Sequence, residues 1–260
     1  MLRLNKFLAT NLGVSRREAD NLIAAGKILV NNKPAEIGAR ISEEDSVVVD
    51  GRKISNVALV YLALNKPAGY VCSRRRQGDT PTMYELLPEK FQSLKSVGRL
   101  DKDSSGLILL TNDGDFAFQM THPKFVKTKI YEARIDRALE PLHQQMIADF
   151  GVQLPDGRSQ LGLEKMSDDR TFWRITMSEG RNRQIRRTFE ALGYKVTALH
   201  RTNFGPYGLD GLESGKFVEV PRVGYFFSKR ESFALRLALS GTPTSVSIPT
   251  RSRPSAVMKV

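Results

Sequence analysis

The segment from Arg99 to Ser105 carries the side chains best suited to chemistry: one arginine, two aspartates and two serines in seven positions. A carboxylate such as that of Asp101 can accept a proton, add to an electron-poor carbon or stabilise positive charge there. The apolar residues 107–111, bounded by glycine-containing turns, predict a strand buried on both faces. Such a strand holds a polar loop still. On composition alone, the simpler interpretation is that Asp101 caps a turn or pairs with an arginine.

A second polar segment, residues 179–193, combines four arginines with a helical pattern. Its apolar residues form one inward stripe that ends at a glycine. At about 100° per residue, Arg183 and Arg187 point away from this stripe, towards phosphates or solvent, whereas Arg186 lies on its flank. Arg186 is therefore the arginine best placed to reach a buried carboxylate.

Alternating and continuous apolar runs predict the elements that position these groups. Residues 129–135 predict a strand with Tyr131 on the same face as two other apolar side chains. The nearly all-apolar residues 57–64 predict a central strand, and residues 172–177 another. Pro141 begins a helix that continues to Phe150.

Several familiar kinds of site are absent from the sequence. The three histidines are scattered and the only cysteine is Cys72, so no zinc-ligand spacing exists. The nucleobase-deaminase signature, a phosphate-binding loop and the Gly-x-Ser-x-Gly turn of hydrolases are all missing. No Gly-x-Gly-x-x-Gly turn follows a strand, which argues against dinucleotide binding and weakly against a methyl-donor pocket. The residues favour chemistry by Asp, Arg and Tyr, without a metal or organic cofactor.

The charge of the chain favours an anionic partner, above all nucleic acid. The 260 residues, enough for one or two domains, carry a net charge of +12. Half of this excess lies in residues 221–260, which hold seven basic and one acidic side chain. Residues 241–254 are rich in Ser, Thr and Pro, which is typical of disorder. A solvated end and a phosphate-contacting tail explain this segment equally well.

Composition also indicates a compartment. A single cysteine cannot form a disulfide within the chain, which fits a reducing environment. No run of about 18 apolar residues predicts a membrane span, and the first residues lack the apolar core of a secretory signal. We therefore expect a cytoplasmic, monomeric protein with no membrane partner.

Residues 1–52 predict a small module of two short helices followed by a β-element. Ser15 and Glu18 form a capping box, and Gly26 ends the second helix. Arg16 and Arg17 lie at the start of that helix, off its apolar face. The pattern resembles the RNA-binding domain named after ribosomal protein S4. The resemblance covers the whole module, so RNA binding by Arg16 and Arg17 is favoured over a purely structural role.

The chemistry-bearing residues of the remaining chain fall in four ordered motifs. They are Leu64-Asn65-Lys66-Pro67-x-Gly69-Tyr70-Val71, Gly98-Arg99-Leu100-Asp101-x-Asp103-Ser104-Ser105-Gly106-Leu107, Lys129-x-Tyr131-x-Ala133-Arg134 and Glu179-Gly180-Arg181-Asn182-Arg183-Gln184-Ile185-Arg186-Arg187. Over residues 58–220 the chain resembles the pseudouridine synthases of the RsuA/RluB/RluE/RluF family, a branch that carries an S4-like domain. One motif would be weak, whereas four in order are specific.

This resemblance implies a reaction on uridine in folded RNA: the base–sugar bond breaks, the base rotates, and it is rejoined through carbon. Asp101 matches the essential aspartate, which either attacks the sugar or assists its deprotonation. Tyr131 matches the residue that stacks on the base, and Arg186 the partner that orients the aspartate. Arg99 matches a side chain that fills the space left by the flipped nucleotide. Leu199 matches an apolar residue beside the base.

The same resemblance implies RNA contacts by Lys66, Arg183 and Arg187, no metal or organic cofactor, and ribosomal RNA or a pre-ribosomal particle as partner. It implies an α+β fold: a small N-terminal αα-β module and a catalytic domain with a mixed, mostly antiparallel sheet flanked by helices. We predict an S4-like domain at 1–52, a catalytic domain at 58–227 and a basic, disordered tail at 228–260.

The sequence therefore predicts a site-specific ribosomal-RNA pseudouridine synthase. The 23S RNA is favoured over 16S RNA because residues 182–187 look closer to large-subunit members. The alternative from another class is a non-catalytic RNA-binding factor for ribosome assembly, against which the intact set of inward-facing residues argues. An RNA methyltransferase is disfavoured by the missing donor-binding turn.

Overall fold

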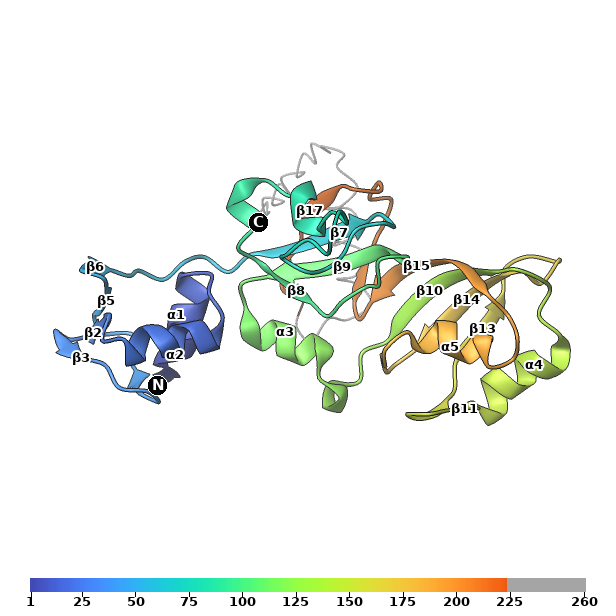
Figure 1. Ribbon diagram of the computed structural model, residues 1–260, viewed down its shortest axis with the longest axis horizontal. Helices are drawn as coiled ribbons and strands as arrows, with labels where there is room; N and C mark the ends of the chain where they lie inside the picture. The colour runs from blue at the N-terminus through green and yellow to red at the C-terminus, as the bar shows by residue number, and fades with distance from the viewer. Residues whose placement is uncertain (224–260) are drawn as a thin grey trace, which may run out of the picture. The chain divides into compact units, whose positions relative to one another are not determined.

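The computed structural model describes residues 1–223 (Figure 1). In this part of the chain, one hydrophobic core lies within residues 4–49 and another within residues 62–199. The domain boundaries given above stay a prediction, and the predicted tail at 228–260 lies outside the described residues. None of the described helices has the length and apolar character needed to cross a lipid bilayer.

The N-terminal module has the predicted pair of helices, α1 (Leu4–Asn11) and α2 (Arg16–Ala24). The capping box is present: the Glu18 amide donates to Ser15 Oγ at 3.1 Å, and the Ser15 amide donates to Glu18 Oε2 at 2.7 Å. Six short strands complete the module: β1 (Leu2–Arg3), β2 (Ile28–Val30), β3 (Lys33–Pro34), β4 (Arg40–Ile41), β5 (Val47–Val49) and β6 (Arg52–Lys53). They form a sheet in the order β3-β2-β5-β6 and a separate β1-β4 pair.

A mixed sheet of nine strands organises the described residues after the module. The strands are β7 (Tyr61–Lys66), β8 (Lys95–Val97), β9 (Ser105–Thr111), β10 (Lys129–Ile135), β13 (Gly162–Lys165), β14 (Phe172–Met177), β15 (Val196–Phe204), β16 (Tyr207–Gly208) and β17 (Phe217–Glu219). Their order is β13-β14-β10-β15-β9-β7-β17, with β16 beside β15 and β8 beside β9. Every pair is antiparallel except β15–β9. The predicted fold class is confirmed.

Short helices connect these strands. They are η1 (Met83–Leu86), η2 (Glu89–Phe91), α3 (Gly114–Thr121), η3 (Pro123–Phe125), α4 (Pro141–Gln145), a single π turn η4 (Met146–Phe150) and α5 (Gln184–Glu190). A small hairpin, β11 (Val152–Leu154) and β12 (Gly157–Ser159), precedes β13. The helix expected from Pro141 to Phe150 is thus an α-helix that relaxes into a π turn.

The start of α3 is tied to the sheet by Asp113. Its carboxylate accepts the amides of Asp115 and Phe116 at 3.0 and 3.1 Å, which caps the helix. The Tyr61 hydroxyl on β7 donates to the same carboxylate at 2.8 Å. Burial, followed by this hydrogen bond, raises the pKa of Tyr61, so its hydroxyl remains a donor. The cap therefore fixes the position of α3 on the sheet.

The central strand lies further along the chain than predicted. We expected it at residues 57–64, whereas β7 spans Tyr61–Lys66 and is buried throughout. Val57 and Leu59 are 43% and 48% exposed, outside the sheet. Pairing decides these limits, because β9 offers partners only from Thr111 opposite Tyr61 to Gly106 opposite Lys66.

The single parallel pair of the sheet depends on a glycine. β15 and β9 meet at two positions, and Gly106 lies opposite Arg201. A Cβ atom on Gly106 would lie 2.2 Å from the Arg201 carbonyl oxygen, and its φ of +107° is a conformation that other residues rarely adopt. Only glycine allows the two strands to approach here, and Asp101 lies in the loop that precedes β9.

We expect Gly106→Ala to lower the free energy of unfolding by about 3 kcal/mol, because the clash adds to the backbone strain. Gly78→Ala is the control: it has φ of +58° but open space around its Cβ, so about 1 kcal/mol is expected. The emission of Trp173, the only tryptophan and fully buried, reports urea unfolding. Equal losses in the two variants would show that the close approach contributes nothing.

Candidate active site

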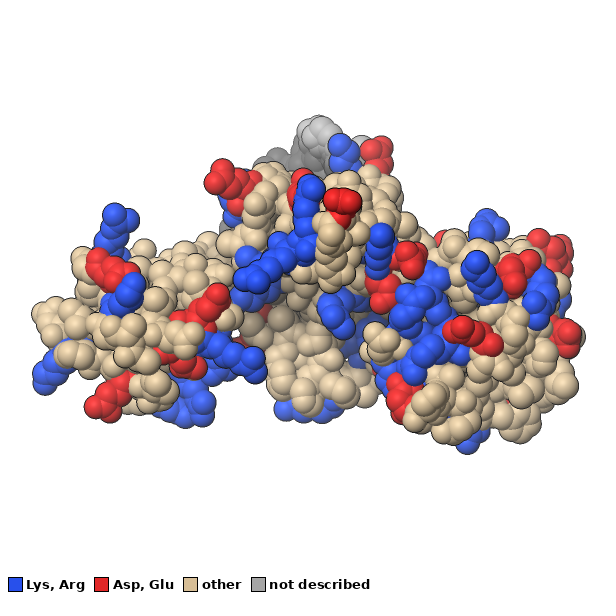
Figure 2. All heavy atoms as spheres, in the orientation of Figure 1, with Lys and Arg blue, Asp and Glu red and all other residues tan. Residues whose placement is uncertain are grey.

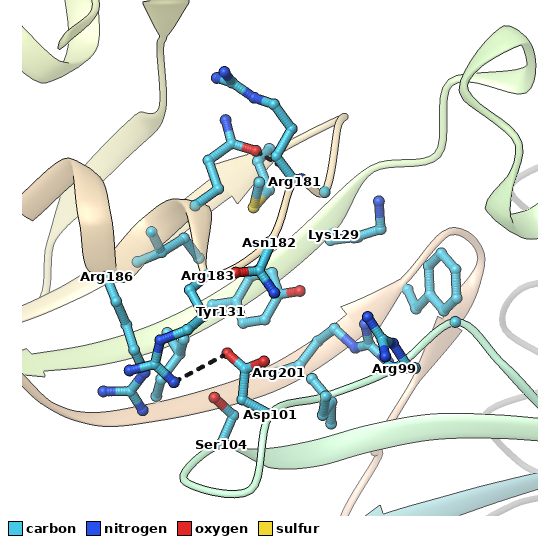
Figure 3. Close-up of a pocket in the computed structure, with 18 of the residues that line it drawn as sticks. Arg99, Asp101, Ser104, Lys129, Tyr131, Arg181, Asn182, Arg183, Arg186 and Arg201 are labelled. Carbon is cyan, nitrogen blue, oxygen red and sulfur yellow. Dashed lines mark hydrogen bonds and ion pairs between the residues drawn. The ribbon is translucent and has the colours of Figure 1, made fainter. Parts of the chain in front are cut away.

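Asp101 opens onto a pocket beside the β15–β9 junction (Figure 3). It lies in the loop between β8 and β9, and its side chain is 34% exposed. The Ser104 amide donates to the Asp101 carbonyl at 3.1 Å, which closes a turn in this loop. Asp101 is the only acidic residue lining the pocket in the described part of the chain, against five arginines and one lysine. The carboxylate is thus accessible and surrounded by positive charge.

One wall of the pocket is apolar. Tyr131 on β10 and Leu199 on β15 line it, although each is less than a tenth exposed. The register pairs Tyr131 with Arg201 and Ala133 with Leu199, so the two side chains come from neighbouring antiparallel strands. The predicted alternation on β10 is confirmed, because Tyr131, Ala133 and Ile135 are all buried. This wall offers a ring and an aliphatic side chain to a flat ligand.

Arg183 provides the guanidinium beside Asp101. Its Nη1 lies 3.7 Å from Asp101 Oδ2 and 3.9 Å from Asp103 Oδ2 (Figure 3). Arg183 was expected to point away from the apolar stripe, towards phosphates or solvent, and its side chain is 43% exposed, but the helical pattern did not place it beside Asp101. That pattern included Arg183 in the helix, whereas α5 begins at Gln184 and Arg183 precedes it with φ of +47°. This left-handed conformation turns the side chain towards the aspartate.

Arg186, expected to pair with Asp101, contacts the backbone instead. Its Nη1 donates to the Val196 carbonyl at 2.7 Å and its Nη2 to the Asp103 carbonyl at 3.0 Å. Burial first, and Arg183 next, lower its pKa, and Asp103 and Asp101 oppose this. An arginine side chain nevertheless keeps its charge. Arg186 thus joins β15 to the loop that carries Asp101 and positions the carboxylate through that loop.

Arg201, which the sequence did not indicate as a site residue, is 2% exposed and lines the same pocket. Its Nε donates to the Leu107 carbonyl at 2.8 Å. Its guanidinium lies 6.0 Å from the Tyr131 ring centroid and 4.9 Å from that of Phe204. The alternation of side chains along β15 could have identified Arg201, because residues two apart on a strand lie on the same face and Leu199 was already a candidate.

Lys129 was also missed, at the first position of β10. Its Nζ donates to the Glu179 carbonyl at 3.0 Å and it lines the pocket. Burial first, and then Arg201, lower the pKa of Lys129, while Glu179 raises it. Arg99, which the sequence did predict, is exposed at the pocket. In Figure 3 it lies on the side of Asp101 opposite Arg183.

Two residues predicted to bind RNA have protein partners instead. Lys66 is fully buried, and its Nζ donates to the carbonyls of Pro67 and Tyr70 at 2.8 Å each. Burial lowers its pKa. Lys66 closes the turn after β7 and cannot reach a ligand, because it is the last residue of a strand that is buried throughout.

Arg187 makes two hydrogen bonds to Asp156, at 3.0 and 2.7 Å. Arg16 and Arg17 are exposed, as expected.

Comparisons with known proteins identify the family of this chain. Residues 60–191 match the family described as RNA pseudouridylate synthase, and residues 2–47 match the S4 domain. The chain is 35% identical to the ribosomal large subunit pseudouridine synthase B of Bacillus subtilis, across 85% of this chain and 92% of that protein. This chain belongs to the RNA pseudouridine synthase family.

Further relatives act, by name, on the other ribosomal subunit. The ribosomal small subunit pseudouridine synthase A of Vibrio parahaemolyticus is also 35% identical, across 83% of this chain and 94% of that protein. A crystal structure of a pseudouridylate synthase superimposes with a TM-score of 0.60 at 33% identity, covering 90% of this chain and all of the other. This pseudouridine synthase thus combines an S4 domain with the family's catalytic fold.

Arg186→Lys in this pseudouridine synthase should lower kcat/KM by about 10- to 100-fold, because one ammonium cannot replace both charged hydrogen bonds across the pocket. The assay is tritium release from ribosomal RNA carrying [5-³H]uridine. Arg187→Lys is the control, since its partner Asp156 is 41% exposed and outside the pocket lining; we expect less than about 3-fold. Comparable losses in both would contradict a special role for Arg186.

Proposed function

We propose that this pseudouridine synthase isomerises uridine in ribosomal RNA, with Asp101 as the group that reacts at the sugar. The observation that carries the proposal is the charge of the pocket: one accessible carboxylate faces an aromatic wall and is surrounded by cations. A binding site for RNA alone has no use for a lone carboxylate, because it repels phosphates. A reaction at an electron-poor sugar carbon requires one.

The Asp101 carboxylate can react at the sugar by either of two routes, and both convert uridine into pseudouridine without loss or gain of atoms. In one, a carboxylate oxygen adds to the sugar carbon as the bond to the base nitrogen breaks, and the ester is displaced when the base returns through carbon. In the other, the carboxylate removes a proton from the neighbouring sugar carbon as the base leaves, which gives a glycal, and it returns that proton to the same carbon when the base rejoins the sugar. In either route the base carbon loses one proton and the nitrogen gains one. The ion pair with Arg183 orients the carboxylate.

The apolar wall suits an extruded base. Tyr131 would stack on the uracil and Leu199 would pack against it, since both line the pocket beside Asp101. Flipping a base out of a helix costs a few kcal/mol, which stacking and a space-filling side chain offset. Arg99 is exposed at the pocket, which suits this filling role.

The cations suit the RNA backbone. Arg183 is 43% exposed, and Arg16 and Arg17 lie on the surface of the N-terminal module, so phosphates can reach all three. Arg187 would have to break its ion pair with Asp156 to bind RNA, so we assign it instead to holding the turn between β11 and β12, which contains Asp156. The relatives named for both ribosomal subunits support ribosomal RNA as substrate. Within it we favour 23S RNA, on the likeness of residues 182–187 to large-subunit members.

Asp101→Asn should lower pseudouridine formation by about 1,000-fold or more while changing RNA affinity only a few fold, because the amide keeps the shape but cannot attack or accept a proton. Single-turnover tritium release and filter binding measure the two effects. Asp168→Asn, at a fully exposed carboxylate, is the control and should match the unchanged enzyme. Retained turnover would refute the role of Asp101, and RNA binding without any turnover by the unchanged protein would favour an assembly factor.

Carbodiimide mapping of ribosomal RNA from a strain lacking the gene should show the loss of one pseudouridine signal in 23S RNA. The unchanged gene should restore it, whereas the Asp101→Asn gene should not, since modification needs the carboxylate. A signal lost from 16S RNA instead would identify the small subunit as the substrate, and loss of no signal would contradict the proposal.

A further inference from the structure

Beside the pocket, the end of α3 and the short helix η3 expose a cluster of aromatic rings. Phe118 is 46% exposed, and its ring centroid lies 4.6 Å from that of His122 and 5.7 Å from that of Phe125. Val126, which follows η3, is 64% exposed. We refer to these residues, together with Lys124, as the α3–η3 surface. Gathered large apolar side chains on a surface mark an interaction site.

The α3–η3 surface continues from the rim of the pocket. Thr121 lines the pocket and lies three residues after Phe118, so the two share one side of α3. A Cβ atom on Gly98 would lie 3.6 Å from Thr121 Cγ2, which brings α3 against the loop that leads to Asp101. A chain that enters the pocket can therefore pass over Phe118.

The backbone of the surface is held in place. The Lys124 amide donates to His122 Nδ1 at 3.3 Å, and the Phe125 amide donates to the His122 carbonyl at 3.1 Å. Val126 has φ of +33°, a conformation that is rare for a β-branched residue and occurs most often at functional sites. The backbone that carries these rings is thus ordered before a ligand binds, which lowers the entropic cost of binding.

The charge of the surface suits RNA. The Lys124 Nζ lies 5.3 Å from the Phe118 ring centroid and 4.7 Å from that of Phe125. Figure 2 shows basic side chains at the lower end of this region. Aromatic rings interleaved with cations are typical of surfaces that bind single-stranded nucleic acid. An exposed cation–π contact shifts an equilibrium by about 2- to 5-fold, whereas the stacking of one base on an aromatic ring strengthens RNA binding by about 5- to 150-fold. A base can therefore displace the ammonium, which then becomes available to a phosphate.

We propose that the α3–η3 surface binds a single-stranded nucleotide flanking the target uridine, with its base stacked on Phe118 and its phosphate paired with Lys124. This inference rests on the proposed function only in taking RNA as the substrate. Stacking is largely independent of base identity, so the surface contributes affinity and holds the strand rather than selecting a sequence.

The test uses the full chain and fluorescein-labelled 12-nucleotide oligouridine at low salt. Phe118→Ala and Phe118→Leu should both weaken binding by about 5-fold or more, since leucine keeps the apolar contact but has no plane for stacking. Phe118→Tyr should restore binding. Phe150→Ala is the matched control, because Phe150 is 57% exposed at the end of η4 and outside the pocket lining. Unchanged Trp173 emission reports an intact fold.

A direct readout is Phe118→Trp, because the natural tryptophan is fully buried. Saturating oligouridine should quench the new emission but not that of Phe150→Trp. Absence of quenching, or full affinity in Phe118→Leu, would overturn the proposal. A change in self-association without a change in oligouridine binding would assign the surface to a second copy of the chain and likewise overturn it. Repeating the binding in Asp101→Asn keeps this result separate from the assignment of the catalytic residue.

Discussion

The contact between Gly106 on β9 and the backbone of Arg201 on β15 is the constraint on which the site depends. It is the single parallel junction of the sheet, and a side chain on Gly106 would collide with β15. The hydrogen bond from Arg201 Nε to the Leu107 carbonyl reinforces it inside the core. Because the loop with Asp101 leads directly into β9, the junction places that carboxylate beside the wall of Tyr131 and Leu199.

The arginines around Asp101 have distinct partners. Arg201 is buried against rings and a carbonyl, Arg186 donates to two carbonyls, and Arg183 alone forms an ion pair with Asp101. Backbone carbonyls stabilise buried guanidinium groups without neutralising them. Among the described residues, the pocket therefore keeps an excess of positive charge, which suits an anionic ligand, and its one carboxylate lies beside the apolar wall of Tyr131 and Leu199.

In the proposed function, the α3–η3 surface and the pocket both bind RNA. The pocket would hold one base beside Asp101, whereas the exposed ring of Phe118 would stack a neighbouring base. Flipping a nucleotide breaks its stacking on both neighbours, so a surface that stacks an adjacent base offsets part of this loss. The capping of α3 by Asp113, which also accepts from Tyr61, links this surface to the central sheet.

The sequence by itself determined the family, the two-part organisation and the burial of Tyr131, because motifs and the periodicities of two and 3.6 are local properties. It also selected Asp101 as the candidate reactive carboxylate. Tertiary structure decided the partner of the aspartate. The helical pattern assigned this role to Arg186. In the structure the helix begins at Gln184, so Arg183 lies before it in a left-handed conformation, and the Arg183 guanidinium forms the ion pair with Asp101. Pairing between distant strands, which no local pattern encodes, likewise decided three further features. They are the burial of Lys66, the limits of β7 and the position of Arg201 beside Gly106.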